Sequence, residues 1–122
     1  MKNQTYRMTL LFDFYGDILT ERQKEFYDLY YNEDLSLAEI AENYGISRQG
    51  VRDVIVRAEG IMTELEEKTG IIKRFKAMQP HVRSICDTVD ELLRSNSVAT
   101  FPDPVLEESL LRIKAEAEAL KE

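Results

Sequence analysis

Residues 37–55, LAEIAENYGISRQGVRDVI, decide the fold of this chain because small and apolar residues recur in them at one specific spacing. Ala41 is small at a position where a second helix would have to cross closely. Gly45 favours the left-handed backbone conformation of a tight turn, which other residues adopt at a cost. The stretch therefore predicts two short helices that meet near a right angle, a helix-turn-helix. The apolar residues expected in its buried seam are Ile40, Tyr44, Ile46, Val51 and Val54.

Cap residues mark where the expected helices begin. Ser36 and Glu39 form the S-x-x-E pattern of a capping box, and Ser47 can cap the helix after the turn. Asp103 followed by Pro104 is typical of the start of a later helix. Apolar residues at helical spacing predict six helices in all, at about residues 5–19, 20–31, 37–43, 48–69, 71–94 and 104–120.

The expected fold class is all-α, with a helix-turn-helix domain over residues 1–68 and a C-terminal helical extension over residues 69–122. Pro80 is expected to kink or divide the fifth helix because proline cannot donate a backbone hydrogen bond. The last helix has a narrow apolar stripe, so we expect it to pack against the fourth helix or a second subunit. Helix-turn-helix proteins often pair to read two half-sites, and a homodimer is therefore among the expected assemblies.

The composition limits the compartment in which the protein works. The single cysteine, Cys86, excludes an intrachain disulfide and fits a reducing compartment. No apolar run approaches the length of about 20 residues that spans a membrane. We therefore expect a cytoplasmic protein without membrane insertion.

Charge is distributed unevenly along the chain. The formal net charge is −7, which opposes binding to duplex DNA without sequence preference, because such binding depends on neutralising phosphates. Residues 36–58 are balanced, whereas residues 68–83 contain basic side chains and no acid. Basic residues beside an aromatic suit contact with RNA or an acidic protein surface, and those of this segment are Lys68, Lys73, Arg74, Lys76 and Arg83. The alternative is a solvated face of an amphipathic helix with Phe75 in the core, and the residues alone favour this alternative.

The helix after the turn carries the candidate nucleic-acid contacts. Its buried stripe leaves Gln49, Arg52 and Asp53 on the opposite face, with Arg48 at the margin near the helix start. Arginine can bind guanine or phosphate, glutamine can pair with adenine, and exposed amides at a helix start can hold a phosphate. The alternative is that these arginines are ordinary solvated helix charges, which can also pair with Asp53 or Glu59. The candidate set is Ser47, Arg48, Gln49, Arg52 and Arg57.

No group of residues points to catalysis, a metal site or a cofactor. His81 is the only histidine, and Cys86 within an apolar stripe is typical of a small buried side chain. The adjacent carboxylates Glu66 and Glu67 diverge on a helix rather than converge on a substrate. There is no glycine-rich phosphate loop. We therefore expect a protein that is not an enzyme.

The segment LTERQKEFYDLYYNEDLSLAEIAENYGISRQGVRDVI resembles region 4 of bacterial sigma factors, and the resemblance covers about residues 19–61. In sigma factors this unit reads the promoter −35 element. The resemblance thus implies sequence-specific binding to duplex DNA. This chain departs from that family on the reading face, where it has Gly50 and Asp53 in place of a common arginine and glutamine.

A closer resemblance is to the YlxM family of small helix-turn-helix proteins from Gram-positive bacteria. It rests on RMTLLFDFY (7–15), LTERQ (19–23), LYYNEDLSLAEIAE (29–42) and GISRQGV (45–51). Members are typically encoded beside the signal recognition particle GTPase. The resemblance therefore implies a regulator of that targeting pathway, with the GTPase or its RNA as partner and duplex DNA as the alternative.

Overall fold

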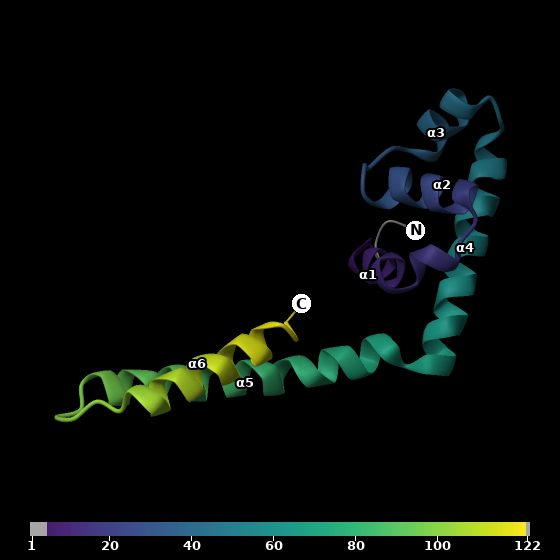
Figure 1. The fold of residues 1–122 in the computed structure, drawn as a ribbon. Coiled ribbons are helices and arrows are strands. Elements are labelled where there is room, and N and C mark those ends of the chain that lie inside the picture. Colours follow the sequence, from purple (N-terminus) through teal and green to yellow (C-terminus); the bar gives the residue numbers. More distant parts are fainter. Residues whose placement is uncertain (1–4, 122) are drawn as a thin grey trace. The chain divides into compact units, whose positions relative to one another are not determined.

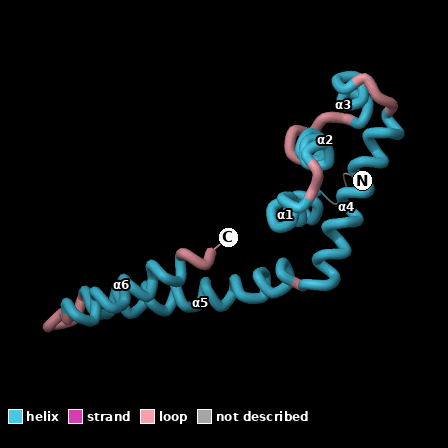
Figure 2. The backbone as a smooth tube through the Cα atoms, turned by 45° about the vertical axis from the view of Figure 1, so that its right-hand side comes forward, coloured by secondary structure: helices cyan, strands magenta, loops and turns pink. Residues whose placement is uncertain are grey.

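The computed structural model describes residues 5–121, and within them the chain is all-α, as predicted. The elements follow one another through short connections (Figures 1 and 2). They are α1 (Thr5–Tyr15), the 3-10 helix η2 (Gly16–Ile18), α2 (Glu21–Tyr31), α3 (Leu37–Tyr44), α4 (Arg48–Thr69), α5 (Ile71–Ser97) and α6 (Pro104–Glu118). The first four residues of the expected 1–68 domain lie outside the described residues.

Two compact units make up the chain. The first ends at Ile72 and the second begins at Lys73, inside α5. The first unit holds α1 to α4, and the second holds most of α5 together with α6. None of the described helices is both long enough and apolar enough to cross a membrane.

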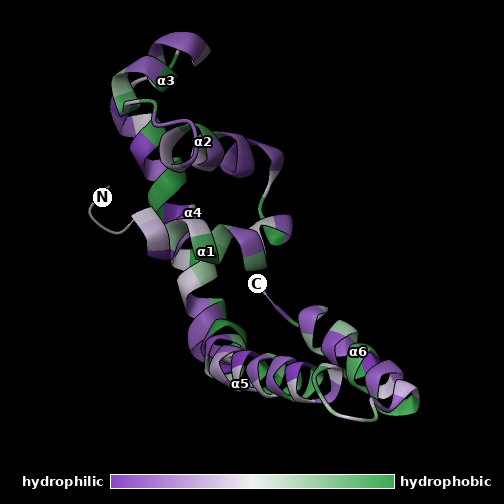
Figure 3. Ribbon diagram, turned by 90° about the vertical axis from the view of Figure 1, so that its left-hand side faces the viewer, coloured by the Kyte–Doolittle hydropathy of each residue, from purple (hydrophilic) through white to green (hydrophobic). Residues whose placement is uncertain are grey.

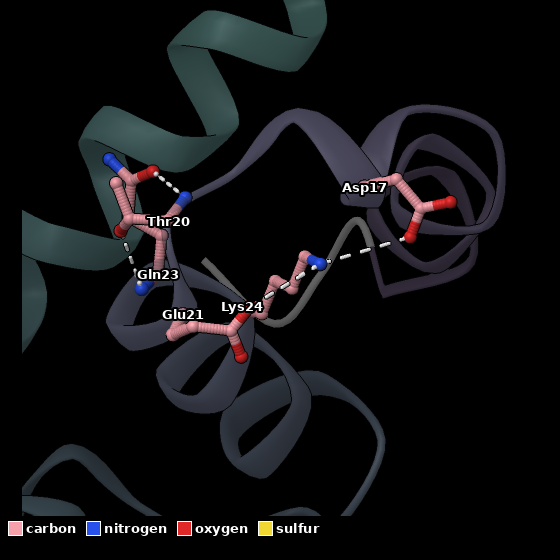
Figure 4. Close-up of polar contacts among 5 residues, drawn as sticks. All are labelled: Asp17, Thr20, Glu21, Gln23 and Lys24. Atoms are coloured by element: carbon pink, nitrogen blue, oxygen red, sulfur yellow. Dashed lines mark hydrogen bonds and ion pairs between the residues drawn. The ribbon is translucent and has the colours of Figure 1, made fainter.

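A reciprocal capping box starts α2 (Figure 4). The Thr20 amide donates to Gln23 Oε1 at 2.9 Å, and the Gln23 amide donates to Thr20 Oγ1 at 3.2 Å. Lys24 lies between two exposed carboxylates, at 3.9 Å from Asp17 and 3.8 Å from Glu21. These pairs are exposed and long, so the cap contributes more to the position of α2 than the ion pairs do.

The helix-turn-helix has the geometry that its sequence predicts. Ser36 and Glu39 form the capping box of α3, with donor–acceptor distances of 3.1 and 3.0 Å. Gly45 ends α3 at φ 66°, in the left-handed region. Ser47 Oγ then accepts from the Gly50 amide at 3.0 Å and starts α4. Each helix end is therefore fixed by local chemistry.

Aromatic side chains dominate the core of the first unit. Tyr27 stacks on Phe12 with ring centroids 5.1 Å apart and contacts Tyr31 at 4.7 Å. Its hydroxyl donates to the Met8 carbonyl at 2.6 Å, which satisfies the buried polar atom. The core also includes completely buried aliphatic residues from the helix-turn-helix, namely Ile40, Val51, Ile55, Ala58 and Met62.

The first helix is shorter than predicted, because α1 ends at Tyr15 rather than near Leu19. The Tyr15 hydroxyl donates to Glu66 Oε1 at 2.6 Å and lies 2.6 Å from Thr69 Oγ1. The chain tightens into η2 after this residue, and Leu19 is buried. The end of α1 therefore coincides with contacts to α4 and with Gly16, the residue that directly follows.

Pro80 lies inside α5, which is continuous from Ile71 to Ser97. We expected Pro80 to kink or divide this segment, and the division is wrong. Pro80 lies on the exposed side of the helix, where water can replace the hydrogen bond that proline cannot donate. The helix also continues three residues past the predicted end at Arg94.

The last helix packs on α5 and runs back along it (Figure 1). Asp103 caps α6 by accepting from the amides of Val105 at 2.9 Å and Leu106 at 3.2 Å, as the sequence predicts. Lys114 pairs with Asp90 of α5 at 2.8 Å. The described packing partner of α6 is α5, which our expectation of the fourth helix or a second subunit did not name, and packing against a second subunit stays a prediction.

Candidate nucleic-acid interface

The first turns of α4 present three polar side chains to solvent. Arg48, Gln49 and Arg52 are exposed, whereas Val51 and Ile55 on the other face are completely buried. The predicted division of this helix into a buried stripe and a polar face is therefore confirmed. Ser47 is exposed too, but its side chain is already used as the helix cap.

An open groove of about 700 Å³ lies in front of these side chains. Arg48, Gln49 and Arg52 line one side of it, residues 36–38 at the start of α3 line another, and Tyr30 of α2 contributes the rest. The starts of α3 and α4 thus reach the same groove. Exposed amides and the positive end of the helix dipole favour an anion at such a place.

The two arginines at the groove have no acidic partner within the described residues. No ion pair of either arginine with Asp53 or Glu59 is among the described contacts, and an ordinary solvated charge stays the alternative to a ligand contact. Asp53 Oδ1 accepts from Gln49 Nε2 at 2.8 Å, and Glu59 accepts from the Tyr31 hydroxyl. Arg48 and Arg52 are therefore available to an anionic ligand, while Asp53 keeps a negative charge close by.

Arg57 lies apart from this groove. It lines a separate hollow of about 240 Å³ together with Arg22, Thr20, Gln23, Asp53 and Val54. Arg22 is held over the Phe26 ring, with 5.4 Å from its Cζ atom to the ring centroid. Of the predicted set of five, Arg48, Gln49 and Arg52 thus line the groove at the start of α4, and Arg57 lines the hollow beside the start of α2. Ser47 lines neither of them and caps α4.

The predicted basic segment belongs to two elements. Lys68 is near the end of α4 and pairs with Glu64 at 2.9 Å. The other four basic residues are exposed on α5, and Phe75 among them is half-buried. Lys73, Lys76 and Arg83 lie on one side of α5 by helical spacing, and Arg74 lies on another.

Sequence reasoning missed part of each hollow. Leu37, Ala38 and Tyr30 line the groove, but they were expected only as helix or core residues. Arg22 lines the second hollow and is two residues after Thr20. The capping-box pattern of Thr20 and Gln23 could have indicated that Arg22 lies at an exposed helix start. Neither hollow is visible in a helical wheel, because each is formed between helices.

Comparison with known proteins identifies relatives for most of the chain. Residues 2–98 match the UPF0122 family model, described as "Putative helix-turn-helix protein, YlxM / p13 like". A UPF0122 protein of Desulforamulus reducens is 45% identical over 85 residues, which cover 70% of this chain and 73% of that protein. One from Halalkalibacterium halodurans is 40% identical over 98 residues, covering 80% of this chain and 90% of that protein. The family match ends before α6 begins.

Proposed function

This chain belongs to the UPF0122 family of YlxM/p13-like helix-turn-helix proteins, and from that premise we propose that it is a non-enzymatic regulator in the signal recognition particle pathway. Its partner in this proposal is the particle's GTPase or the particle's RNA, and its compartment is the cytoplasm. The observation that carries the proposal is the groove at the starts of α3 and α4, where Arg48 and Arg52 have no acidic partner within the described residues.

The groove suits a compact anionic feature better than a long run of phosphates. Its two arginines and the helix starts beside it can hold one or two phosphates or carboxylates. A net charge of −7 opposes extended contact with a nucleic-acid backbone. A folded RNA or an acidic protein surface offers such a local feature, and duplex DNA of arbitrary sequence does not.

The basic side of α5 supplies a second contact in this proposal. Lys73, Lys76 and Arg83 are exposed and lie on one side of the helix. Charges on one side of a helix can act together on a phosphate backbone or an acidic surface. Lys68, Arg74 and Arg57 are assigned weaker roles, because they lie on other faces or in the separate hollow.

The test measures binding of the purified full chain to the particle's RNA and to its GTPase separately. We expect an Arg48→Ala/Arg52→Ala variant to bind its partner at least about tenfold more weakly, because two charge-assisted contacts are lost. The matched control is Arg112→Ala/Lys121→Ala, which removes the same charge from exposed positions elsewhere. Absence of binding to both partners at micromolar concentration would contradict the proposal.

A second candidate is sequence-specific reading of duplex DNA, and the exposed trio of Arg48, Gln49 and Arg52 favours it. These residue types at the first turns of a recognition helix can contact base edges in the major groove. The test is selection of binding sites from random duplexes, repeated with Arg52→Ala. An enriched site that is lost in the variant supports DNA reading, whereas no enrichment contradicts it.

A further inference from the structure

The second unit buries few side chains between its two helices. Its core cluster consists of Val82, Cys86 and Ala117, with Met78 packed against it. Two helices with so small a core bury too little apolar surface to be stable by themselves. Apolar side chains that remain exposed on this unit therefore mark where another molecule can cover it.

One row of exposed apolar side chains runs along α6. Leu106, Ile113 and Leu120 are 42%, 48% and 50% exposed, and they follow one another at intervals of seven residues. We call these three residues the α6 row. Leu110 and Ala117, on the adjacent side of the same helix, are buried. Only part of the apolar stripe of α6 is therefore covered by α5.

A second row lies on α5. Ile85 and Leu92 are 46% and 47% exposed and are also seven residues apart. We call them the α5 row. The neighbouring buried residues, Val82 and Val89, face the interior of the hairpin. Each helix thus has a buried stripe with an exposed apolar row beside it.

Both rows lie on the same flank of the hairpin. The ion pair of Asp90 and Lys114 marks one flank. At about 100° per residue, the α5 row is on the opposite side of the buried stripe from Asp90, and the α6 row is on the opposite side from Lys114. Asp90 and Lys114 meet on one flank of the hairpin, so the side chains on the opposite side of each buried stripe meet on the other flank. The two rows therefore form one apolar surface.

This flank carries little charge. The residues beside the α5 row are His81, Ser84, Thr88 and Ser95, and Glu116 lies at the outer border of the α6 row. The charged residues of this part of α5 occupy its remaining sides, namely Arg83, Asp87, Asp90, Glu91 and Arg94. Hydrophobic and hydrophilic residues follow one another along the ribbons of α5 and α6 in Figure 3.

We propose that this flank is a homodimer interface, in which the α5 and α6 rows pack against the same rows of a second copy. A two-fold axis brings identical surfaces together, so a nearly uncharged surface meets its copy without like-charge repulsion. Apolar residues at seven-residue intervals suit the knobs-into-holes packing of a helical bundle. The second copy supplies the two further helices that such a bundle needs.

The test is the mass of the full chain in solution, by sedimentation equilibrium from micromolar to about 100 µM concentration. We expect twice the chain mass of 14.2 kDa at the upper concentration. An Ile113→Asp variant places a carboxylate in the interface of each copy and should raise the dimer dissociation constant at least about 100-fold.

The matched control is Leu111→Asp, at a residue that is 50% exposed on α6 but lies away from the row. This variant should keep the wild-type mass, and helicity measured by circular dichroism should be equal in both variants. A monomeric wild-type protein at about 100 µM would overturn the proposal. So would a dimer that survives Ile113→Asp or that is lost equally in Leu111→Asp.

Discussion

The two units of this chain bury their apolar residues to very different extents. In the first unit, Phe26, Tyr27 and Ile55 are completely inaccessible to solvent, and aromatic rings fill the space between α1, α2 and α4. In the second unit the core cluster has three members, and Val98 and Phe101 beyond α5 are 83% and 89% exposed. Segments of one chain can thus either enclose their apolar side chains in a core or leave many of them exposed.

The largest expected effect tests whether the first unit is held by its closed core. Ile55→Ala should lower the free energy of unfolding by about 2–5 kcal/mol, because a completely buried side chain is replaced by a cavity. The control Leu111→Ala removes a half-exposed side chain from α6 and should change stability by less than about 0.5 kcal/mol. Urea denaturation measures both. Equal losses would remove the contrast between the two units.

Alkaline pH should destabilise the first unit more than the second, because all six tyrosines lie within the first 44 residues. Burial raises the pKa of Tyr27 and Tyr31 well above the usual value, and the Glu59 carboxylate raises both further. The neutral phenols therefore stabilise the folded state fully below about pH 10, and this stability is lost as the pH rises above that value.

Each such tyrosine should contribute a loss of about 1.4 kcal/mol per pH unit in this range. Absorbance of tyrosinate and far-ultraviolet circular dichroism, recorded together, measure ionisation and unfolding. Tyr31→Phe removes one of the buried tyrosines whose pKa is raised and should make the stability less dependent on pH above about 10. An unchanged alkaline transition in this variant would contradict the assignment.

The smallest expected effects are changes in stability of opposite sign at two glycines of the first unit. Gly45→Ala should destabilise by about 1–2 kcal/mol, because φ 66° is unfavourable for a residue with a side chain. Gly60→Ala should stabilise by about 0.5–1 kcal/mol, because Gly60 is inside α4 and an added Cβ has no described atom within 4 Å. Thermal unfolding of both variants measures the difference. A shift of the same sign in both would contradict the backbone argument.

The start of each capped helix could be predicted from the sequence because the information is local. Thr20, Ser36, Ser47 and Asp103 each bind an amide two or three residues ahead, and such a pattern is visible in a few letters. The turn at Gly45 was predictable for the same reason. The polar face at the start of α4 followed from helical spacing.

Features that depend on distant residues could not be predicted. Tyr15, at the end of α1, contacts Glu66 and Thr69, which are more than fifty residues away in the sequence. Pro80 does not divide α5 because it lies on the exposed side, and the sequence does not reveal which side the neighbouring helix covers. The same limit explains why Arg57 was grouped with Arg48, although the two arginines line different hollows.

The reactivity of Cys86 can be used to measure local unfolding of the second unit. It is the only cysteine of the chain and is 4% exposed in the core cluster between α5 and α6. A buried thiol reacts with a disulfide reagent only in moments when the helices separate. The rate at which Cys86 is labelled therefore measures how often the two helices separate. If a second copy covers the hairpin, this labelling rate should fall as the protein concentration rises.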